Sequence, residues 1–227
     1  MKLVGHRGAK GLAPENTIRS IQKALEYGVD EVEIDVRVTS DNVPILYHNR
    51  SVSTNDGQRF KISNCKYEDL KKYKHDITTL DEAISTVHGK SKLCIEVKPR
   101  VNIAPIVKLI HSRLETDCNN SDLQLASFSF KILKDFKEKL PQVELVVIES
   151  WSGVRAGYRA RYLNAEHISL NQRWLWSGYL KLASKHDGKI YAYTLNNPKK
   201  AKRLESSGLA GVITDYPDRY SNQKPRS

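Results

Sequence analysis

The chain has 227 residues, of which 39% are hydrophobic and 28% are charged. This balance is typical of a globular protein and excludes a disordered chain. The length suits one large domain or two small ones, with a substantial core, and the repeated strand–helix pattern described below leads us to expect a single domain over residues 1–227. No apolar run reaches membrane-spanning length, and the first is too short for a secretion signal. We therefore expect a cytoplasmic protein without stable membrane insertion.

The formal net charge is +11, which would attract nucleic acid, anionic membranes or phosphorylated substrates. The basic residues are scattered and form no uninterrupted arm. We interpret them as a solvated surface that helps to draw in an anionic substrate, and we expect no nucleic-acid partner. The three cysteines, Cys65, Cys94 and Cys118, include no close pair and predict neither a disulfide framework nor a zinc knuckle.

The first predicted element is a short strand over residues 2–4, which ends at Gly5-His6-Arg7-Gly8. A glycine-rich loop follows. Apolar residues then recur at helical spacing from Ile18 until Gly28 stops the helix. The order strand, helix, strand predicts a βαβ unit.

The second strand, over residues 31–39, alternates strictly between valine or isoleucine and charged residues. Strand side chains alternate with period two, so Glu33 and Asp35 point to the same side. If the apolar side packs against helices, both carboxylates point into the centre of a closed sheet. Charge is costly there unless it is paired or bound to a metal.

A short extended run over residues 43–48 is interpreted as an extension of the second strand. Residues 49–78 are polar and irregular, and we interpret them as a small insertion with a turn at 55–57 and at most a short helix over 67–73. Thr79 then caps a helix to Gly89, with Glu82 at the capping-box position.

The next strand, over residues 92–97, ends in Glu96-Val97-Lys98-Pro99. The alternation of helices and strands continues to the end of the chain. The remaining helices are predicted over 103–115, 129–139, 153–163, 174–186 and 198–207, and the remaining strands over 123–128, 143–149, 166–170, 189–195 and 211–214. Eight strands separated by helices favour a (β/α)8 TIM barrel over an open doubly wound sheet.

In such a barrel the working groups lie at the C-terminal ends of the strands. Three carboxylates on adjacent strands can share one hard cation such as Mg²⁺ or Ca²⁺. Two histidines suit acid/base work near neutral pH better than a zinc site, and an arginine and a lysine offer charge to phosphate. The residues selected in this way are His6, Arg7, Glu33, Asp35, His48, Glu96 and Lys98.

Each of these residues also has an ordinary structural interpretation. Glu33 with Arg37, or Glu96 with Lys98, could be plain ion pairs, and a lone histidine is more often a hydrogen-bonded turn residue. Convergence of seven ionisable residues at three adjacent strand ends favours a functional site. The other histidines, His75, His88, His111, His167 and His186, are expected to have ordinary structural roles.

Several motifs follow one another along nearly the whole chain. They are His6-Arg7-Gly8, Pro14-Glu15-Asn16-Thr17, Glu33-Ile34-Asp35, His48, Glu96-Val97-Lys98, Ser127-Phe128, Tyr193-Thr194-Leu195-Asn196 and Gly211-Val212-Ile213-Thr214-Asp215-Tyr216-Pro217. Taken together and in this order, they resemble the signature of the glycerophosphodiester phosphodiesterases. That family's fold is a (β/α)8 barrel with a small insertion after the second strand.

The resemblance implies a role for each matched residue. It implies that His6 and His48 are the general acid and base, that Glu33, Asp35 and Glu96 hold a divalent metal, and that Arg7 and Lys98 contact the phosphate. Glu15, with Asn16, would mainly shape the first loop and orient its neighbours at the substrate, while Phe128 and Tyr193 would line the substrate wall. Two departures, Asn49 for the family's aspartate and Tyr193 for a frequent tryptophan, bear on substrate preference.

The reaction implied by the resemblance is metal-dependent hydrolysis of a glycerophosphodiester to an alcohol and glycerol 3-phosphate. The alternatives are a lysophospholipase D-type phosphodiesterase on the same fold, a phosphate-binding barrel without catalysis, and a nucleic-acid-binding protein. The sequence leaves open the head group, the choice between Mg²⁺ and Ca²⁺, the order of the two histidines and the oligomeric state.

Overall fold

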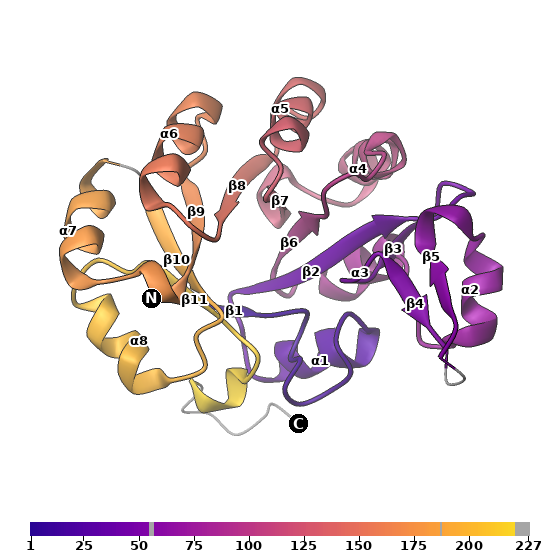
Figure 1. Ribbon diagram of the computed structural model, residues 1–227, viewed down its shortest axis with the longest axis horizontal. Helices are drawn as coiled ribbons and strands as arrows, with labels where there is room; N and C mark the ends of the chain where they lie inside the picture. The colour runs from indigo at the N-terminus through magenta and orange to yellow at the C-terminus, as the bar shows by residue number, and fades with distance from the viewer. Residues whose placement is uncertain (55–56, 187, 221–227) are drawn as a thin grey trace.

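Eight parallel strands close into a barrel in a computed structural model that describes residues 1–54, 57–186 and 188–220. The strands pair in the order β1-β11-β10-β9-β8-β7-β6-β2, and β2 pairs back to β1 (Figure 1). This confirms the predicted (β/α)8 TIM barrel. The barrel strands are β1 (Lys2–Gly5), β2 (Glu31–Val38), β6 (Lys92–Val97), β7 (Leu123–Ser127), β8 (Glu144–Glu149), β9 (His167–Asn171), β10 (Lys189–Tyr193) and β11 (Gly211–Thr214).

Helices connect consecutive barrel strands and surround the barrel in Figure 1. Their starts follow local sequence signals: the Thr79 side chain and Glu82 form the predicted reciprocal capping box. The connecting helices are α1 (Ile18–Glu26), α3 (Leu80–Val87), α4 (Ala104–Thr116), α5 (Phe130–Lys139), α6 (Gly153–Leu163), α7 (Ser177–His186) and α8 (Pro198–Glu205). Short 3-10 turns lie at Ile62–Asn64, Asn120–Asp122, Gln172–Trp174 and Pro217–Arg219.

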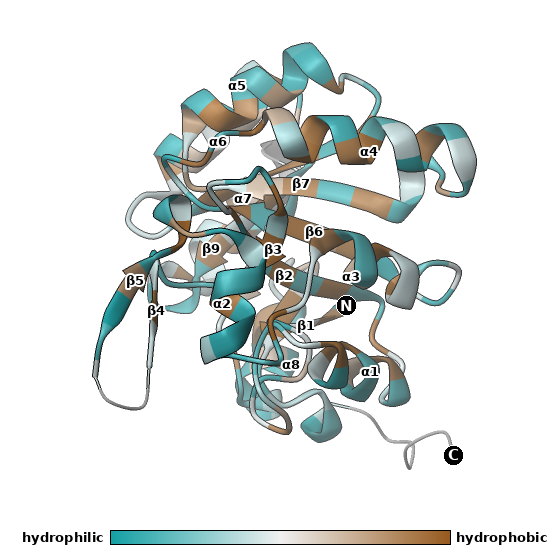
Figure 2. Ribbon diagram, turned by 90° about the vertical axis from the view of Figure 1, so that its right-hand side faces the viewer, coloured by the Kyte–Doolittle hydropathy of each residue, from teal (hydrophilic) through white to brown (hydrophobic). Residues whose placement is uncertain are grey.

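The main core lies between the barrel and the helices. Val32, Ile34 and Val36 of β2 are buried in this core, whereas Glu33 lines a cavity inside the barrel, as the strict alternation predicts. In Figure 2, α4 and α5 carry alternating brown and teal bands, as expected for helices with one buried face. The same packing that buries the apolar side of β2 therefore turns its carboxylates inward.

The segment after β2 differs from the prediction. Residues Pro44–Leu46 form β3, a separate strand that pairs antiparallel to β2 and is not its extension. The insertion contains a two-stranded sheet, β4 (Ser51–Ser53) and β5 (Arg59–Lys61), and the predicted short helix α2 (Tyr67–Tyr73). These elements enclose a small cluster of Ile45, Val52, Ile62, Leu70 and Ile77, so the segment is less irregular than its polarity suggested. Most of the predicted turn at 55–57 lies outside the described residues.

The strand register brings the functional residues to one level. Asp35 of β2 pairs with Glu96 of β6, and Gly5 of β1 pairs with Thr214 of β11. Because parallel strands point the same way, the residues that follow Gly5 and Thr214 lie side by side at one end of the barrel. Among the described residues, no helix has the length and apolar character needed to cross a membrane.

Substitution of Gly8 tests how tightly the loop after β1 packs. Its φ is +81°, and a Cβ added there would lie 2.3 Å from the Ser20 Oγ. Gly8→Ala should lower the free energy of unfolding by roughly 3 kcal/mol, because left-handed strain adds to overpacking. Gly28 has φ +66° but open space around its Cβ position, so Gly28→Ala should cost only about 1 kcal/mol. Urea unfolding measures both losses, and equal values would contradict the steric explanation.

Candidate active site

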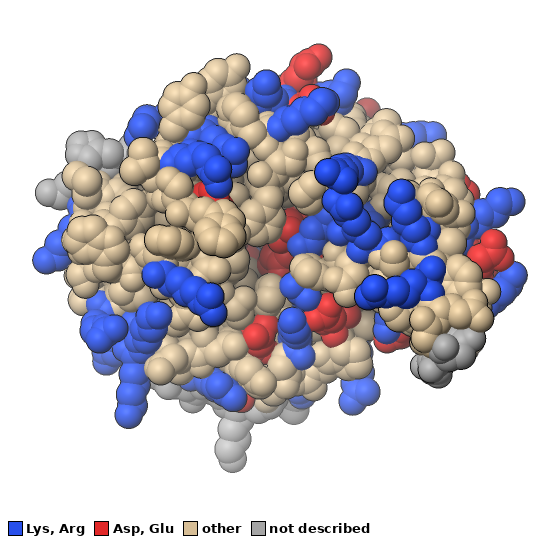
Figure 3. Space-filling model, viewed as in Figure 1, with Lys and Arg blue, Asp and Glu red and all other residues tan. Residues whose placement is uncertain are grey.

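A cavity of about 190 Å³ opens at the C-terminal ends of the barrel strands and continues into the barrel. Figure 3 shows acidic side chains at the bottom of a central hollow, with basic side chains around it. Eight of the residues selected from the sequence line this cavity, and they come from the neighbouring strand ends of β1, β2, β6 and β7, from β10 further round the barrel, and from the loop after β3. They are His6, Arg7, Glu33, His48, Glu96, Lys98, Phe128 and Tyr193.

Three carboxylates form the centre of the site. Glu33, Asp35 and Glu96 are all buried, and each offers an oxygen within 4.8 Å of the others. Glu33 Oε2 accepts a hydrogen bond from the backbone N–H of Arg7 at 2.9 Å, whereas the buried Oε1 has no protein partner among the described residues. Burial, and then repulsion from Asp35 and Glu96, raises the pKa of Glu33 well above its usual value.

Lys98 neutralises part of this negative charge. Its Nζ lies 2.5 Å from Asp35 Oδ1 and also forms a short contact with Glu96 Oε1. Burial raises the pKa of Asp35, but Lys98 and Arg7 outweigh that effect and lower it. For Glu96, burial prevails over the attraction of Lys98, and the pKa is raised. The predicted pair of Glu96 with Lys98 therefore exists, but it belongs to a larger cluster.

This cluster fits a hard divalent cation by its own chemistry. All three groups are carboxylates, which Mg²⁺ and Ca²⁺ prefer as ligands. Arg7 and Lys98 bring two positive charges to three buried carboxyl groups, and the Glu33 Oε1 atom is a buried acceptor without a protein donor in the described chain. A cation beside Glu33 would supply both the missing charge and the missing partner.

Arg7 is placed by an unusual backbone turn and by two carboxylates. Its φ is +52°, just before Gly8, and its Nε lies 2.9 Å from Asp35 Oδ2. Its Nη1 donates to both Glu15 oxygens, at 2.9 and 3.0 Å. Glu15 does not line the cavity, so its contact with the site runs through Arg7.

Asn16 fixes the position of Asp35. Its Nδ2 donates to Asp35 Oδ2 at 2.9 Å, and its Oδ1 accepts from the Asp35 backbone N–H at 3.0 Å. Asn16 itself has φ +58°, a conformation that asparagine tolerates better than most residues. The loop after β1 is thus tied to β2 by a reciprocal pair of hydrogen bonds.

His6 has a partner that sequence reasoning did not single out. Its Nδ1 lies 2.6 Å from Asp215 Oδ1, just after β11. Asn196 holds the other oxygen of Asp215 through its Nδ2 at 2.8 Å. Burial raises the pKa of Asp215, but the hydrogen bonds from His6 and Asn196 outweigh it and lower the pKa. An ionised Asp215 accepts from Nδ1–H, so Nε2 is the ring nitrogen of His6 that this contact leaves available in the cavity.

His48 lies in the loop after β3 and lines the same cavity. Arg37 donates to the His48 carbonyl oxygen through Nε and Nη2, at 3.1 and 2.9 Å, so it fixes the loop and does not pair with Glu33. The ring Nδ1 lies 3.1 Å from Asn49 Oδ1, which can only accept, so Nδ1 carries the proton in this contact. Burial, and then the charge of Lys98, lowers the pKa of His48.

Phe128 and Tyr193 form an aromatic wall beside the carboxylates. Their rings meet edge to face, with centroids 6.1 Å apart. The Tyr193 hydroxyl donates to the Glu149 carbonyl oxygen at 3.1 Å and lies 3.0 Å from the Ser150 Oγ. Burial raises the Tyr193 pKa to about 12, so the hydroxyl remains neutral and the ring presents an apolar surface.

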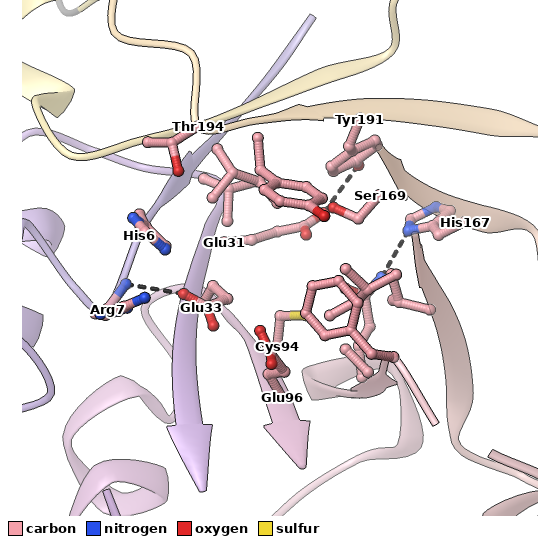
Figure 4. A pocket seen from close by; sticks show the side chains of 18 of the residues that line it. His6, Arg7, Glu31, Glu33, Cys94, Glu96, His167, Ser169, Tyr191 and Thr194 are labelled. Atoms are coloured by element: carbon pink, nitrogen blue, oxygen red, sulfur yellow. Dashed lines mark hydrogen bonds between the residues drawn. The ribbon is translucent and has the colours of Figure 1, made fainter. Parts of the chain in front are cut away.

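The floor of the cavity is polar, which the sequence analysis missed. His167, expected to have an ordinary role, faces into the barrel, where its Nδ1 lies 2.9 Å from Gln124 Nε2. Glu31 also points inward and accepts a hydrogen bond from the Tyr191 hydroxyl at 3.0 Å (Figure 4). The alternation that selected Glu33 and Asp35 places Glu31 on the same side, so this residue could have been identified from the sequence.

Comparisons with known proteins identify the family of the chain. The sequence model of the Glycerophosphoryl diester phosphodiesterase family matches residues 6–219. YhdW of Bacillus subtilis (strain 168), provisionally named a glycerophosphodiester phosphodiesterase, is 31% identical over 96% of both chains. The glycerophosphodiester phosphodiesterase of Caldanaerobacter subterraneus is 26% identical, over 97% of this chain and 96% of its own.

The barrel is also similar to solved structures. A phosphodiesterase from Oleispira antarctica, solved in complex with the product sn-glycerol-3-phosphate, superimposes with a TM-score of 0.85 and 26% identity. The match covers 96% of this chain and 94% of that one. The family match over nearly the whole chain shows that the chain belongs to the glycerophosphoryl diester phosphodiesterase family and is a phosphodiester hydrolase.

Proposed function

We propose that the protein hydrolyses glycerophosphodiesters to an alcohol and glycerol 3-phosphate at the mouth of the barrel. This proposal rests on one observation: two histidines, three buried carboxylates and the positively charged side chains of Arg7 and Lys98 lie together at one cavity. This combination supplies the groups that phosphodiester hydrolysis needs, namely charge for the phosphoryl oxygens and two sites for proton transfer.

Glu33, Asp35 and Glu96 would hold a divalent cation, Mg²⁺ or Ca²⁺. Once bound there, the cation supplies Lewis-acid polarisation of phosphoryl oxygens. Arg7 and Lys98 would contact the same phosphate and stabilise the charge that develops in the transition state. Asn16 holds Asp35, and Glu15 holds Arg7, so these charged groups are oriented before substrate binds.

His48 and His6 would move the two protons of the reaction. Because its pKa is lowered, His48 is neutral at pH 7 and suits the group that accepts a proton from the nucleophile. His6, held by Asp215 through Nδ1–H, would act in its imidazolium form and give the Nε2 proton to the leaving alkoxide, while Nδ1 keeps its own proton. Departure of the alcohol then leaves glycerol 3-phosphate on the Arg7 side of the cavity.

The size of the cavity favours a compact substrate. Its volume of about 190 Å³ is below the roughly 300–1,000 Å³ of pockets that take drug-sized ligands. A glycerol phosphate with a small head group suits this space, with Phe128 and Tyr193 along the alcohol. A lysophospholipid would have to keep its acyl chain outside the cavity, which makes a lysophospholipase D activity the second candidate.

The protein is proposed to act in the cytoplasm. Support comes from its cysteines: Cys65, Cys94 and Cys118 are all free thiols. Unpaired cysteines suit a reducing compartment, where disulfides are rare.

Removal of either histidine tests the proton transfers. His6→Ala and His48→Ala should each lower kcat on glycerophosphocholine by roughly 10²–10⁴-fold, since each removes one general acid or base. His111→Ala, on the exposed side of α4, is the matched control and should keep wild-type turnover. Thermal unfolding should be similar for all three variants. Near wild-type kcat in both active-site variants would refute the assignment.

Metal removal tests the carboxylate cluster. EDTA should abolish turnover, and added Mg²⁺ or Ca²⁺ should restore it. Glu33→Gln and Glu96→Gln should each raise the metal concentration needed for half-maximal activity. The increase should exceed ~10–100-fold, which is the effect of removing a residue that only hydrogen-bonds to a metal ligand. Glu31→Gln is the control, because this carboxylate lies on the same strand but pairs with Tyr191. Hydrolysis that continues without metal would rule out this part of the proposal.

The pH profile tests the role of His48. The pKa of His48 is lowered from the ordinary histidine value of 6.5, so the neutral ring that acts as the base still predominates at pH 6.5. The base is lost only when the pH falls through this lowered pKa. The acid limb of kcat/KM should therefore lie below pH 6.5. Lys98→Met should move that limb toward higher pH, whatever it does to the maximal rate. A limb at or above pH 6.5 in the wild type would argue against His48 as the base.

A further inference from the structure

All three tryptophans of the chain are exposed on one side of the cavity mouth. Trp151 follows β8, while Trp174 and Trp176 follow β9, and these strands are neighbours in the barrel. Their exposed fractions are 72%, 48% and 66%. Loops after barrel strands lie at the same end as the active site. Large aromatic side chains are costly to leave in water, so such a concentration of them indicates a binding surface.

The two loops form one continuous surface. Tyr179, near the start of α7, packs on Gly153 at the start of α6, where an added Cβ would lie 2.4 Å from the Tyr179 ring. From α6, the exposed side chains of Val154 and Tyr158 extend the surface, since residues four apart share a helix face. We call Trp151, Val154, Tyr158, Trp174 and Trp176 the aromatic rim.

The aromatic rim lies in a basic environment. Residues 150–163 and 171–183 contain no aspartate or glutamate. The nearby carboxylate of Glu149 is 2% exposed and pairs with both Arg155 and Arg159, which leaves one of these two charges in excess. In Figure 3, blue groups flank a broad tan surface over α6 and α7, beside the central hollow. The basic residues of the two segments are Arg155, Arg159, Arg161, Arg173 and Lys181.

We propose that the aromatic rim docks the enzyme peripherally onto a membrane with anionic head groups. Tryptophan and tyrosine settle at the level of lipid head groups, where their apolar rings and polar atoms are both accommodated. Basic side chains beside them add attraction to anionic lipids. This combination needs no membrane-spanning helix and uses no residue assigned to catalysis.

The charge of the surface argues for lipid over a second copy of the chain. A symmetric dimer through the aromatic rim would bring two sets of basic residues together, and neither segment offers an acidic partner. An anionic lipid surface supplies the opposite charge over the whole area. Docked in this way, the enzyme would present its cavity mouth at the level of the head groups.

The tryptophans report directly on this interaction. On addition of vesicles of phosphatidylcholine with 30% phosphatidylglycerol, at about 0.1 M ionic strength, their emission should shift to the blue, and the protein should sediment with the vesicles. Pure phosphatidylcholine vesicles should bind more weakly. Trp151→Ser and Trp176→Ser should each weaken partitioning by about tenfold, because each buries less apolar area. Tyr73→Ser on α2, which is 50% exposed, is the control and should bind as the wild type does.

A charge-matched pair of variants separates the aromatic rim from the overall charge of +11. Arg173→Glu with Lys181→Glu should weaken vesicle binding far more than Lys72→Glu with Lys131→Glu, although both change the net charge equally. Equal weakening would overturn the proposal, as would absence of binding to the anionic vesicles. A dimer that Trp176→Ser dissociates in sedimentation velocity would assign the surface to a second copy instead.

Measuring activity on soluble glycerophosphocholine separates membrane docking from the proposed hydrolytic function. The Trp151→Ser and Trp176→Ser variants should retain wild-type kcat and KM on that substrate. Loss of vesicle binding with full activity supports docking through the aromatic rim. Full vesicle binding by both variants overturns it, whether or not the enzyme proves to be a glycerophosphodiesterase.

Discussion

Three carboxylates buried at the end of a barrel constrain much of the surrounding structure. Burying one unpaired charge costs several kcal/mol even after relaxation, and removal of one partner from a buried ion pair costs about 3–5 kcal/mol. Glu33, Asp35 and Glu96 persist together because Lys98 lies between two of them and Arg7 approaches from the first loop. Arg7 reaches the cluster through both its backbone N–H, which binds Glu33, and its guanidinium. This arrangement requires the left-handed turn at Arg7 and the close packing of Gly8.

The barrel supplies this arrangement through strand register. Pairing of Asp35 with Glu96 fixes the height of two carboxylates, and closure between β1 and β11 places His6 beside Asp215. Residues 209 positions apart in sequence thus become hydrogen-bond partners. A shift of one residue in the pairing of β2 would turn Glu33 and Asp35 outward and bury their charges against the helices. The site and the core therefore depend on the same register.

Local patterns were enough to predict the barrel and the inward carboxylates. The alternation of residues 31–38 is a property of one strand, and the capping box at Thr79 is a property of one turn. The contact of Asp215 with His6 depends on barrel closure, and no local pattern contains it. The antiparallel turn of β3 was missed because an extended run of apolar residues does not reveal its direction. The inward orientation of His167 was not predicted because it depends on the register of β9, which the sequence does not mark.

The polar floor shows that the barrel interior is not built for stability alone. A barrel of this size is ordinarily filled by layers of branched apolar side chains. Here Glu31, Gln124 and His167 occupy inward positions, and the Gln124 side-chain oxygen has no protein partner among the described residues. Burial raises the pKa of Glu31 and outweighs its hydrogen bond from Tyr191. Stability lost at these positions must be recovered between barrel and helices, where the apolar residues of β2 and the helices form the main core. Because the main core lies outside the barrel, charged side chains can occupy the inner face of the sheet. Catalysis at the mouth of the barrel requires such charged side chains.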